Sequence, residues 1–170
     1  LAAGAMVVRH KRNKGLGQAF RTAVDYAIDH GFDVMVNMDG DGQFDPRDIQ
    51  RLIDPILREE ADFVTGSRFL TGRKIEHMPA VKRWGNARMN RLVSRLCGQD
   101  FSDVSCGFRA YNRETLLNIN FYGRFTYTQE SFVCFRFNNL AMAEAPIAVR
   151  YFPERKSRVA GSVWTYFKRT

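Results

Sequence analysis

Helix-like and strand-like patterns alternate along the first half of the chain. Between residues 16 and 28, apolar residues recur at three- and four-residue steps, which predicts an amphipathic helix that Gly31 would end. The predicted elements of this half are a strand at 6–9, the helix at 16–28, a strand at 32–38, a helix that starts at Asp45-Pro46, and a strand at 61–66. This alternation favours an α/β fold with a mainly parallel, Rossmann-like sheet flanked by helices.

The second half continues in the same manner. Its predicted elements are a helix at 80–97, a strand at 105–111, a short helix at 113–118, a helix at 127–138 and a strand at 143–150. Pro55 falls inside the second helix of the chain and is expected to kink it. No repeat or linker is visible, and 170 residues suit one domain with a real core.

Two carboxylates follow the apolar strand at 32–38. In extended backbone the side chains of Asp39 and Asp41 project to the same side. Ligands of such sheets bind beyond the carboxyl ends of the strands, where this segment falls. Paired carboxylates there suit Mg²⁺ or Mn²⁺, which prefer oxygen ligands and share them with substrate phosphates. The alternative is a solvated turn, because Asp-Gly pairs are common turn formers.

Charge and cysteine content limit the function classes. The formal net charge of +8 favours an anionic partner, such as a nucleotide, a phospholipid surface or a nucleic acid, although many basic proteins have no such partner. Three cysteines without metal-type spacing indicate reduced thiols in a cytoplasmic protein. No run of about 18 apolar residues predicts a membrane span.

Several short motifs occur in a fixed order along nearly the whole chain. They are N-K-G-L-G at 13–17, D-G-D-G-Q at 39–43, G-S-R-F at 66–69, D-V-S-C-G-F-R at 103–109, Q-E at 129–130 and R-K-S-R at 155–158. Together they resemble the family 2 glycosyltransferases of the GT-A fold, and most of all the dolichol- or polyprenyl-phosphate mannose or glucose synthases.

This resemblance implies an inverting, metal-dependent glycosyltransferase. It would move a sugar from a nucleotide-diphosphate sugar to an acceptor, expected to be a polyprenyl or dolichyl phosphate, with Mg²⁺ or Mn²⁺ as cofactor. Contact with the cytoplasmic face of a membrane is also expected. Family members begin with a strand, a helix and a strand that hold the nucleotide base, and these would precede Leu1. Residues 1–170 are therefore expected to form a single partial domain, the carboxyl-terminal portion of a GT-A catalytic domain, which alone binds nucleotide poorly.

The resemblance also assigns site residues near the donor. Asp39, Asp41 and Gln43 would hold the metal ion that bridges the donor diphosphate. The segment with Lys14, Gly15 and Gly17 would lie near the donor nucleotide, because backbone N–H groups before a helix suit an anion. A basic turn that merely begins a helix is the alternative for Lys14.

A second group of residues is assigned to catalysis. Asp103 and Glu130 are the predicted catalytic carboxylates, with Glu130 at the position of the general base that deprotonates an acceptor hydroxyl. A lipid phosphate needs little help from a base, so Glu130 could instead only position other residues or be a solvated helix carboxylate. Asp103 could likewise cap or pair structurally.

The remaining residues are assigned to the acceptor phosphate. Arg109 could bind phosphate or orient a carboxylate. The other predicted contacts are Ser67, Arg68, Arg155, Ser157 and Arg158. Arginine offers bidentate hydrogen bonds to phosphate, whereas the bland reading of residues 155–158 is a solvated basic loop.

Two rival functions remain open at this level. A nucleotidyltransferase also uses paired aspartates on an α/β sheet, and a non-catalytic basic module could bind an anionic membrane or a polyanion. The basic residues are spread over several elements, without a signature of RNA or DNA binding. The donor base, the sugar, the acceptor and the oligomeric state do not follow from the sequence.

Overall fold

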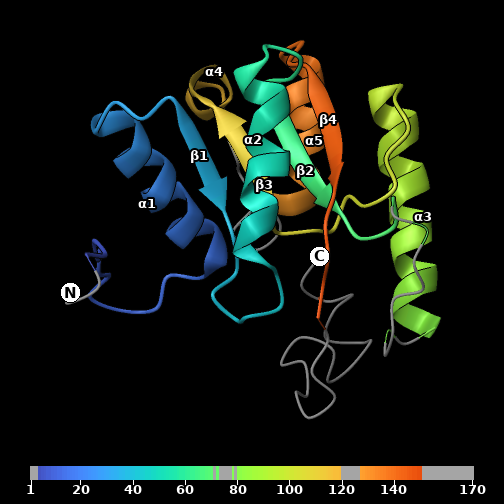
Figure 1. Ribbon diagram of the computed structural model, residues 1–170, viewed down its shortest axis with the longest axis horizontal. Helices are drawn as coiled ribbons and strands as arrows, with labels where there is room; N and C mark the ends of the chain where they lie inside the picture. The colour runs from blue at the N-terminus through green and yellow to red at the C-terminus, as the bar shows by residue number, and fades with distance from the viewer. Residues whose placement is uncertain (1–3, 71, 73–77, 79, 120–126, 151–170) are drawn as a thin grey trace.

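A mixed sheet with helices on both faces carries the fold (Figure 1). The computed structural model describes residues 4–70, 72, 78, 80–119 and 127–150. Within these residues the sheet has four strands in the order β1-β3-β2-β4. The strands are β1 (Val34–Asn37), β2 (Phe63–Ser67), β3 (Arg109–Asn112) and β4 (Met142–Pro146). This arrangement agrees with the α/β fold expected from the alternating pattern.

One strand of the sheet, β3, runs opposite to the other three. β2 and β4 pair in parallel, whereas β3 is antiparallel to both β1 and β2. The register places Arg109, the first residue of β3, opposite Asn37 and Thr65 near the carboxyl ends of β1 and β2. Because β3 begins at that edge, it must run back through the sheet. The carboxyl ends of β1, β2 and β4 therefore share an edge with the loop that precedes β3.

The helices follow the predicted periodicity closely. They are α1 (Leu16–Asp29), the 3₁₀ helix η1 (Pro46–Asp48), α2 (Ile49–Leu57), α3 (Ala80–Cys97), α4 (Arg113–Leu117) and α5 (Tyr127–Phe137). Gly31, with φ of 71°, ends α1, and Phe32 N–H donates to the Ala27 carbonyl at 3.0 Å as in a Schellman motif. None of the helices in the described ranges is long and apolar enough to cross a bilayer.

Local signals before α2 also behave as expected. The Asp45 carboxylate accepts a hydrogen bond from Arg47 N–H, with Pro46 at the first helical position. The first turn is a 3₁₀ helix before α2 begins at Ile49. Pro55 lies inside α2, which ends two residues later at Leu57.

Four strand predictions need correction. Residues 6–9 form no strand, because no strand among the described residues pairs with them; Val7 and Val8 are exposed. The strand predicted at 32–38 is shorter, since β1 covers Val34–Asn37, and it is half-buried at the edge of the described sheet. Residues 105–108 form a loop before β3, and β4 ends at Pro146, beyond which Val149 forms an isolated bridge with Phe44.

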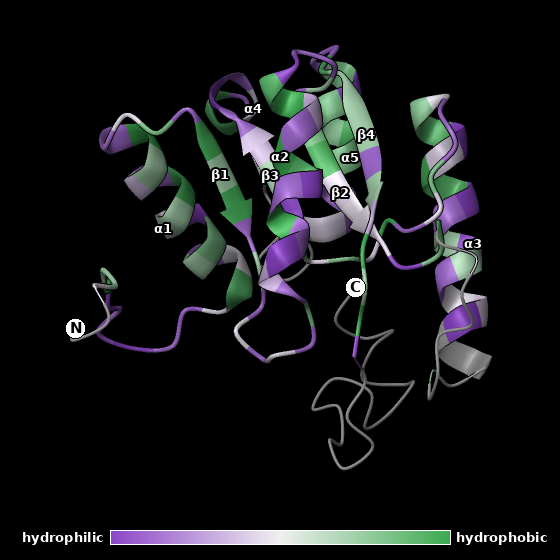
Figure 2. Ribbon diagram, viewed as in Figure 1, coloured by the Kyte–Doolittle hydropathy of each residue, from purple (hydrophilic) through white to green (hydrophobic). Residues whose placement is uncertain are grey.

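The sheet separates two hydrophobic clusters. The larger one fills the face covered by α1, α3, α4 and α5, and is centred on Phe63, whose ring contacts Tyr111, Phe132 and Phe135. The smaller one lies under α2 and includes Leu52 and the neighbour of Phe63, Val64, because successive strand residues point to opposite faces. Figure 2 shows the hydrophobic residues gathered in the strands and on the helix sides that meet the sheet.

Candidate active site

The loop with the paired aspartates follows β1 at the carboxyl edge of the sheet. Gln43 N–H donates to Asp41 Oδ1 at 3.1 Å, and Arg150 N–H donates to the Gln43 carbonyl at 2.9 Å. The next residue, Phe44, bridges Val149 and packs its ring on Phe108, with the ring centroids 5.2 Å apart. The aspartate loop is therefore fixed by the segment after β4 as well as by its own turn.

Asp39 lies directly against the second sequence motif. A Cβ atom placed on Gly107 would lie 3.2 Å from Asp39 Oδ2, so any larger residue would require the Asp39 carboxylate to shift. Asn37, at the end of β1, donates from its side-chain amide to the Gly107 carbonyl at 2.7 Å. The structure thus brings the D-G-D-G-Q and D-V-S-C-G-F-R motifs together at one edge.

The electrostatics of this loop suit a cation. Partial burial raises the pKa of Asp39, and the negative charge of Asp41 raises it further, although the Asp39 side chain still reaches solvent. A divalent ion would relieve this repulsion, and carboxylate oxygens are its preferred donors. No group of three or more His, Cys, Asp or Glu side chains that could hold a metal occurs in the described part of the chain. Further ligands would have to be amide, substrate or water oxygens.

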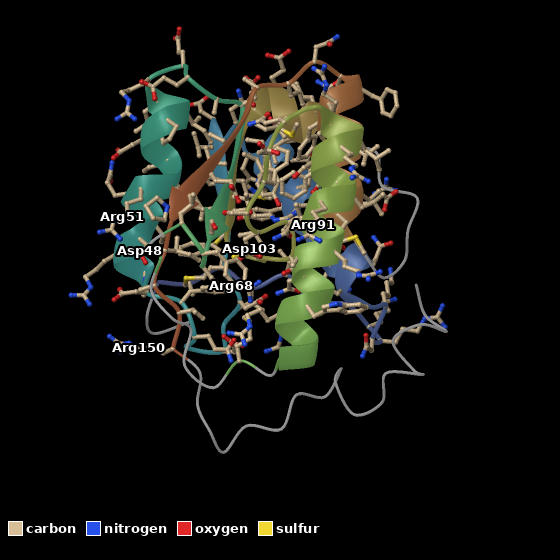
Figure 3. The ribbon with its side chains drawn as sticks, turned by 90° about the vertical axis from the view of Figure 1, so that its right-hand side faces the viewer. Asp48, Arg51, Arg68, Arg91, Asp103 and Arg150 are labelled. Atoms are coloured by element: carbon tan, nitrogen blue, oxygen red, sulfur yellow. The ribbon has the colours of Figure 1, made fainter. Side chains whose placement is uncertain are left out.

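Arg68 and Asp103 form a buried ion pair at the end of β2 (Figure 3). Arg68 Nε lies 2.6 Å from Asp103 Oδ2, and Nη2 lies 2.8 Å from Oδ1. Arg68 Nη2 also donates to Ser105 Oγ at 2.8 Å. The side chains are 8% and 0% exposed, so both predicted site residues engage the protein itself.

Arg109 is buried and holds the loop that precedes it. Its guanidinium donates to the carbonyls of Cys106 at 2.7 Å and Val104 at 3.0 Å, and to Ser131 Oγ at 2.8 Å. It also lies over the rings of Phe63 and Phe132, 5.6 Å and 5.1 Å from their centroids. These contacts fix residues 104–106 rather than presenting the guanidinium to solvent.

Sequence reasoning missed two residues that hold the same loop. Glu144 in β4 accepts hydrogen bonds from the N–H groups of Ser102 and Asp103 at 2.8 and 2.9 Å. Asn90 in α3 accepts one from Val104 N–H at 3.1 Å and donates to the Ser102 carbonyl. A lone glutamate within an otherwise apolar strand was the available signal for Glu144.

Ser67 and the cysteines are also placed inside the protein. Ser67 is buried, and its Oγ lies 2.5 Å from Ser102 Oγ. Cys97 and Cys106 are buried free thiols and Cys134 is half-buried, as expected of reduced cysteines. Burial raises the pKa of the Cys106 thiol to about 12, which makes it unreactive near neutral pH.

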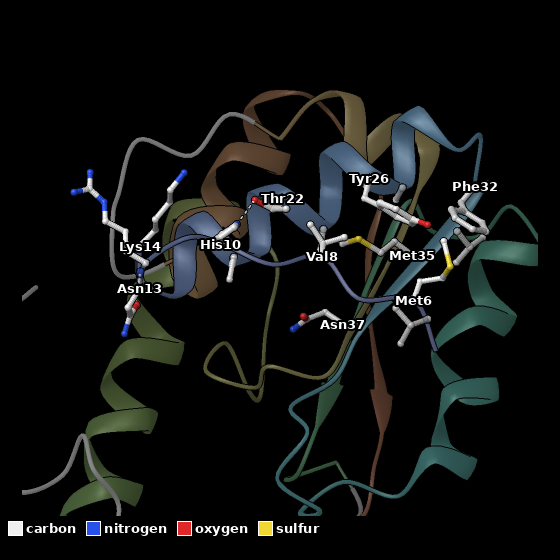
Figure 4. Close-up of a pocket in the computed structure, with 17 residues that line it drawn as sticks. Met6, Val8, His10, Asn13, Lys14, Thr22, Tyr26, Phe32, Met35 and Asn37 are labelled. Carbon is white, nitrogen blue, oxygen red and sulfur yellow. Dashed lines mark hydrogen bonds between the residues drawn. The ribbon is translucent and has the colours of Figure 1, made fainter. Parts of the chain in front are cut away.

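The Lys14 segment borders a cavity of about 740 Å³ beside β1 (Figure 4). Residues 6–15, α1 and β1 form its walls, and Asn37 lies among its lining residues. Lys14 is exposed, and Gly15 N–H donates to the Asn13 side chain at 2.9 Å just before α1. Gly15 has φ of 88°, a conformation that favours glycine.

The remaining predicted residues are less informative. Gly17 lies in the first turn of α1, and Glu130 is half-buried in the first turn of α5. Arg155, Ser157 and Arg158 lie outside the described residues.

Known proteins resemble this chain in sequence and in fold. The family model described as "Glycosyl transferase family 2" matches residues 2–119. UDP-N-acetylglucosamine–dolichyl-phosphate N-acetylglucosaminyltransferase of Methanococcus voltae is 30% identical over 86% of this chain and 59% of its own length. Polyprenol monophosphomannose synthase of Mycolicibacterium smegmatis is 30% identical over 91% and 60%, respectively. The chain thus spans about 60% of the length of these two relatives.

The fold also matches solved structures. Glucosyl-3-phosphoglycerate synthase of Mycobacterium tuberculosis in complex with UDP has a TM-score of 0.60 at 21% identity, over 99% of this chain and 62% of that one. A complex of the same enzyme with Mn²⁺, UDP-glucose and phosphoglyceric acid has a TM-score of 0.54 at 21% identity, over 87% and 50%. The motifs, the fold and the family match agree: this chain belongs to glycosyl transferase family 2.

Proposed function

We propose that this domain takes part in transfer of a sugar from a nucleotide-diphosphate sugar to a polyprenyl- or dolichyl-type lipid phosphate. The observation that carries the proposal is the aspartate loop packed on Gly107 at the carboxyl edge of the sheet. The names of the relatives from Methanococcus voltae and Mycolicibacterium smegmatis support a lipid-phosphate acceptor. Membership of the family decides against the rival nucleotidyltransferase.

The reaction we propose is a single displacement with inversion. An acceptor oxygen attacks the anomeric carbon from the face opposite the diphosphate; the new glycosidic bond forms as the bond to the diphosphate oxygen breaks. Asp39 and Asp41, with Gln43, would hold the divalent ion, which supplies compensation for the charge that grows on the leaving diphosphate. Mn²⁺ accompanies UDP-glucose in the mycobacterial enzyme of similar fold, which supports the same class of ion here.

The Lys14 segment is the proposed neighbour of the donor. Lys14 is an exposed cation directly before the first turn of α1, where the helix dipole also favours an anion. Gly15 and Gly17 leave room for a close approach of the ligand to the backbone.

The buried residues are better suited to positioning than to contact with substrate. Arg68 pairs with Asp103, and Arg109 donates to the carbonyls of Val104 and Cys106, so we assign all three to holding Gly107 beside Asp39. Ser67 joins them through Ser102. Glu130 remains the proposed base for an acceptor hydroxyl, with a positioning role if the acceptor is a phosphate. Arg155, Ser157 and Arg158 remain predicted contacts of the acceptor phosphate.

Calorimetric titration of Mn²⁺, with and without UDP or GDP, tests the metal and donor site. We expect Mn²⁺ to bind, and Asp39→Ala with Asp41→Ala to abolish that binding. Gly107→Ala should weaken Mn²⁺ binding by about tenfold, because the added Cβ would press on the Asp39 carboxylate. Gly85→Ala, where a Cβ meets no atom within 4 Å, is the matched control and should leave binding unchanged.

Two results would contradict the proposal. Equal Mn²⁺ affinity in the unmodified protein and the double aspartate variant would mean that this loop does not bind the metal. Unchanged binding in Gly107→Ala, with an intact fold, would show that contact between the two motifs has no bearing on the site.

A further inference from the structure

The outer face of α3 combines exposed apolar and cationic side chains. Trp84, Leu92 and Leu96 are 60%, 53% and 61% exposed. At 100° per residue these three side chains span about 120° of the helix circumference, with Trp84 opposite Val93 and Leu96 nearer the buried side. Val93 and Cys97 are buried in the larger core, so the helix already uses its inner face within the domain. The three exposed apolar residues belong to neither hydrophobic cluster of the described residues.

The same helix is cationic along its length. Residues 80–97 contain five Lys and Arg and no Asp or Glu. Arg83, Arg88, Arg91 and Arg95 are exposed, and none of the ion pairs seen in the described ranges engages them. Charges of a single sign along one helix favour a partner of opposite charge.

Arginines lie beside the apolar residues on this outer face. The Arg88 guanidinium lies over the Trp84 ring, 4.2 Å from its centroid. Arg91 and Arg95 also border a cavity of about 620 Å³ beside α3, whose other walls include Asp100 and Glu144. The Glu144 carboxylate accepts hydrogen bonds from the backbone of residues 102 and 103, so it faces the loop before β3.

We propose that the outer face of α3, defined by Trp84, Arg88, Leu92, Arg95 and Leu96, docks on an anionic lipid bilayer. Tryptophan and leucine side chains would enter the boundary between headgroups and acyl chains, while the arginines extend to the lipid phosphates. A nucleic acid would satisfy the charge but would leave the two leucines in water. The combination of both chemistries on one face favours the membrane.

The position of α3 gives this docking a consequence for the site. The helix lies at one side of the molecule, and no other labelled element lies beyond it in Figure 1. Through Asn90 it also holds the backbone of residues 102–104, which leads to Gly107. Docking of α3 would therefore bring the loop of the candidate active site close to the lipid surface. The docking proposal goes beyond the proposed transfer reaction and does not depend on it.

Co-sedimentation with vesicles tests the proposal without any nucleotide or acceptor. The probes are vesicles of phosphatidylcholine alone and of equal parts phosphatidylcholine and phosphatidylglycerol. We expect binding to the anionic vesicles only. The double change Arg88→Glu and Arg95→Glu should weaken it at least about thirtyfold, because each cation near the surface contributes about 1 kcal/mol. Arg21→Glu with Arg136→Glu alters the net charge equally at exposed positions of α1 and α5, and should have a much smaller effect.

The apolar part of the proposal has its own variant. Trp84→Ala and Leu92→Gln together should weaken binding at least about tenfold at constant charge. Leu57→Gln with Leu117→Gln is the matched control, since both leucines are exposed elsewhere. Circular dichroism verifies that each variant is folded.

Three outcomes would overturn the proposal. They are equal loss of binding in the two charge-reversed proteins, unchanged binding after removal of Trp84 and Leu92, and a dimer in solution that these apolar changes dissociate. Because Mn²⁺ and nucleotide binding are measured separately, failure here leaves the transfer proposal standing.

Discussion

At the scale of single residues, ionisation of the Asp39 carboxyl group destabilises the folded state. Burial and the charge of Asp41 raise its pKa above the ordinary value. A carboxyl group whose pKa is raised by folding binds its proton more tightly in the folded state than in the unfolded state. The contribution of this group to the stability of the metal-free protein therefore falls as the pH rises through its titration.

Asp39→Asn should accordingly stabilise the metal-free protein at neutral pH. Well below the ordinary aspartate pKa of about 3.9, both proteins are uncharged at residue 39, so their stabilities should agree. The advantage of the variant should grow as the pH rises past that value and become constant above the raised pKa of Asp39. Thermal unfolding midpoints of the two proteins between about pH 3 and about pH 7 measure this difference.

Mn²⁺ should reverse the order at neutral pH, because it stabilises only the protein that binds it. Asp25→Asn, at an exposed position of α1, controls for the general loss of a negative charge. A variant at residue 39 that is less stable than the unmodified protein at every pH would contradict the argument.

At the scale of elements, one ion pair joins the end of β2 to the loop before β3. Arg68 and Asp103 are 35 positions apart in sequence, and the carboxylate accepts from both the side chain and the backbone N–H of Arg68. Removal of one partner of a buried ion pair leaves the charge of the other without its counter-ion. The pair is therefore a sensitive point of the loop that carries Gly107.

Arg68→Met should lower the free energy of unfolding by about 3–5 kcal/mol. Adding Asp103→Leu should restore much of the loss, because an apolar pair needs no desolvation of charge. Urea denaturation of the single and double variants gives both values. The exposed pair of Arg47 and Asp45 is the control, and Arg47→Met should change stability little. If the second substitution adds further destabilisation, then the cost comes from lost packing and not from the stranded charge.

The elements also show what could be predicted from the sequence. The bounds of α3 agree with the helix predicted at 80–97. The aspartate loop was found because its signal is local: an apolar run that stops at two carboxylates. Residues 6–9 were predicted wrongly as a strand, since β propensity says nothing of whether a partner strand is present.

Contacts between distant residues lay beyond the sequence pattern. Nothing in the periodicity pairs Arg68 with Asp103 or directs Glu144 to the amides of residues 102–103. The antiparallel direction of β3 was likewise missed, because it follows from where the preceding loop crosses the sheet. These features depend on tertiary placement, and the positioning residues of the site are largely of this kind.

At the scale of the whole molecule, the sheet divides the core into two clusters that share no residue. Substitutions in different clusters should act independently, whereas substitutions that touch within one cluster should be coupled. The chain offers a close test of each case. A Cβ on Gly66 in β2 would lie 2.8 Å from Cδ1 of Ile147 and 3.1 Å from the Phe108 carbonyl oxygen.

Gly66→Ala should destabilise the protein by about 1–3 kcal/mol through overpacking. Ile147→Val removes the closest methyl group and alone should cost about 0.5–1.5 kcal/mol. The double variant should cost less than the two single changes together by about 0.5 kcal/mol or more, because the missing Cδ1 leaves room for the new Cβ. Relief should be partial, since the Phe108 carbonyl remains. Urea denaturation of the four proteins completes the cycle.

Leu116→Ala provides the comparison across the sheet. Leu116 is buried in the larger cluster, and its truncation should cost about 2–5 kcal/mol. Combined with Ile147→Val in the smaller cluster, the costs should add to within about 0.5 kcal/mol. Strong coupling across the sheet, or simple additivity between residues 66 and 147, would mean that the two faces of the sheet do not pack as separate units. With additivity across the sheet and coupling within one face, the site at the carboxyl edge rests on two independent supports: the α2 face that carries Phe108, and the opposite face in which Arg109 holds the loop before it.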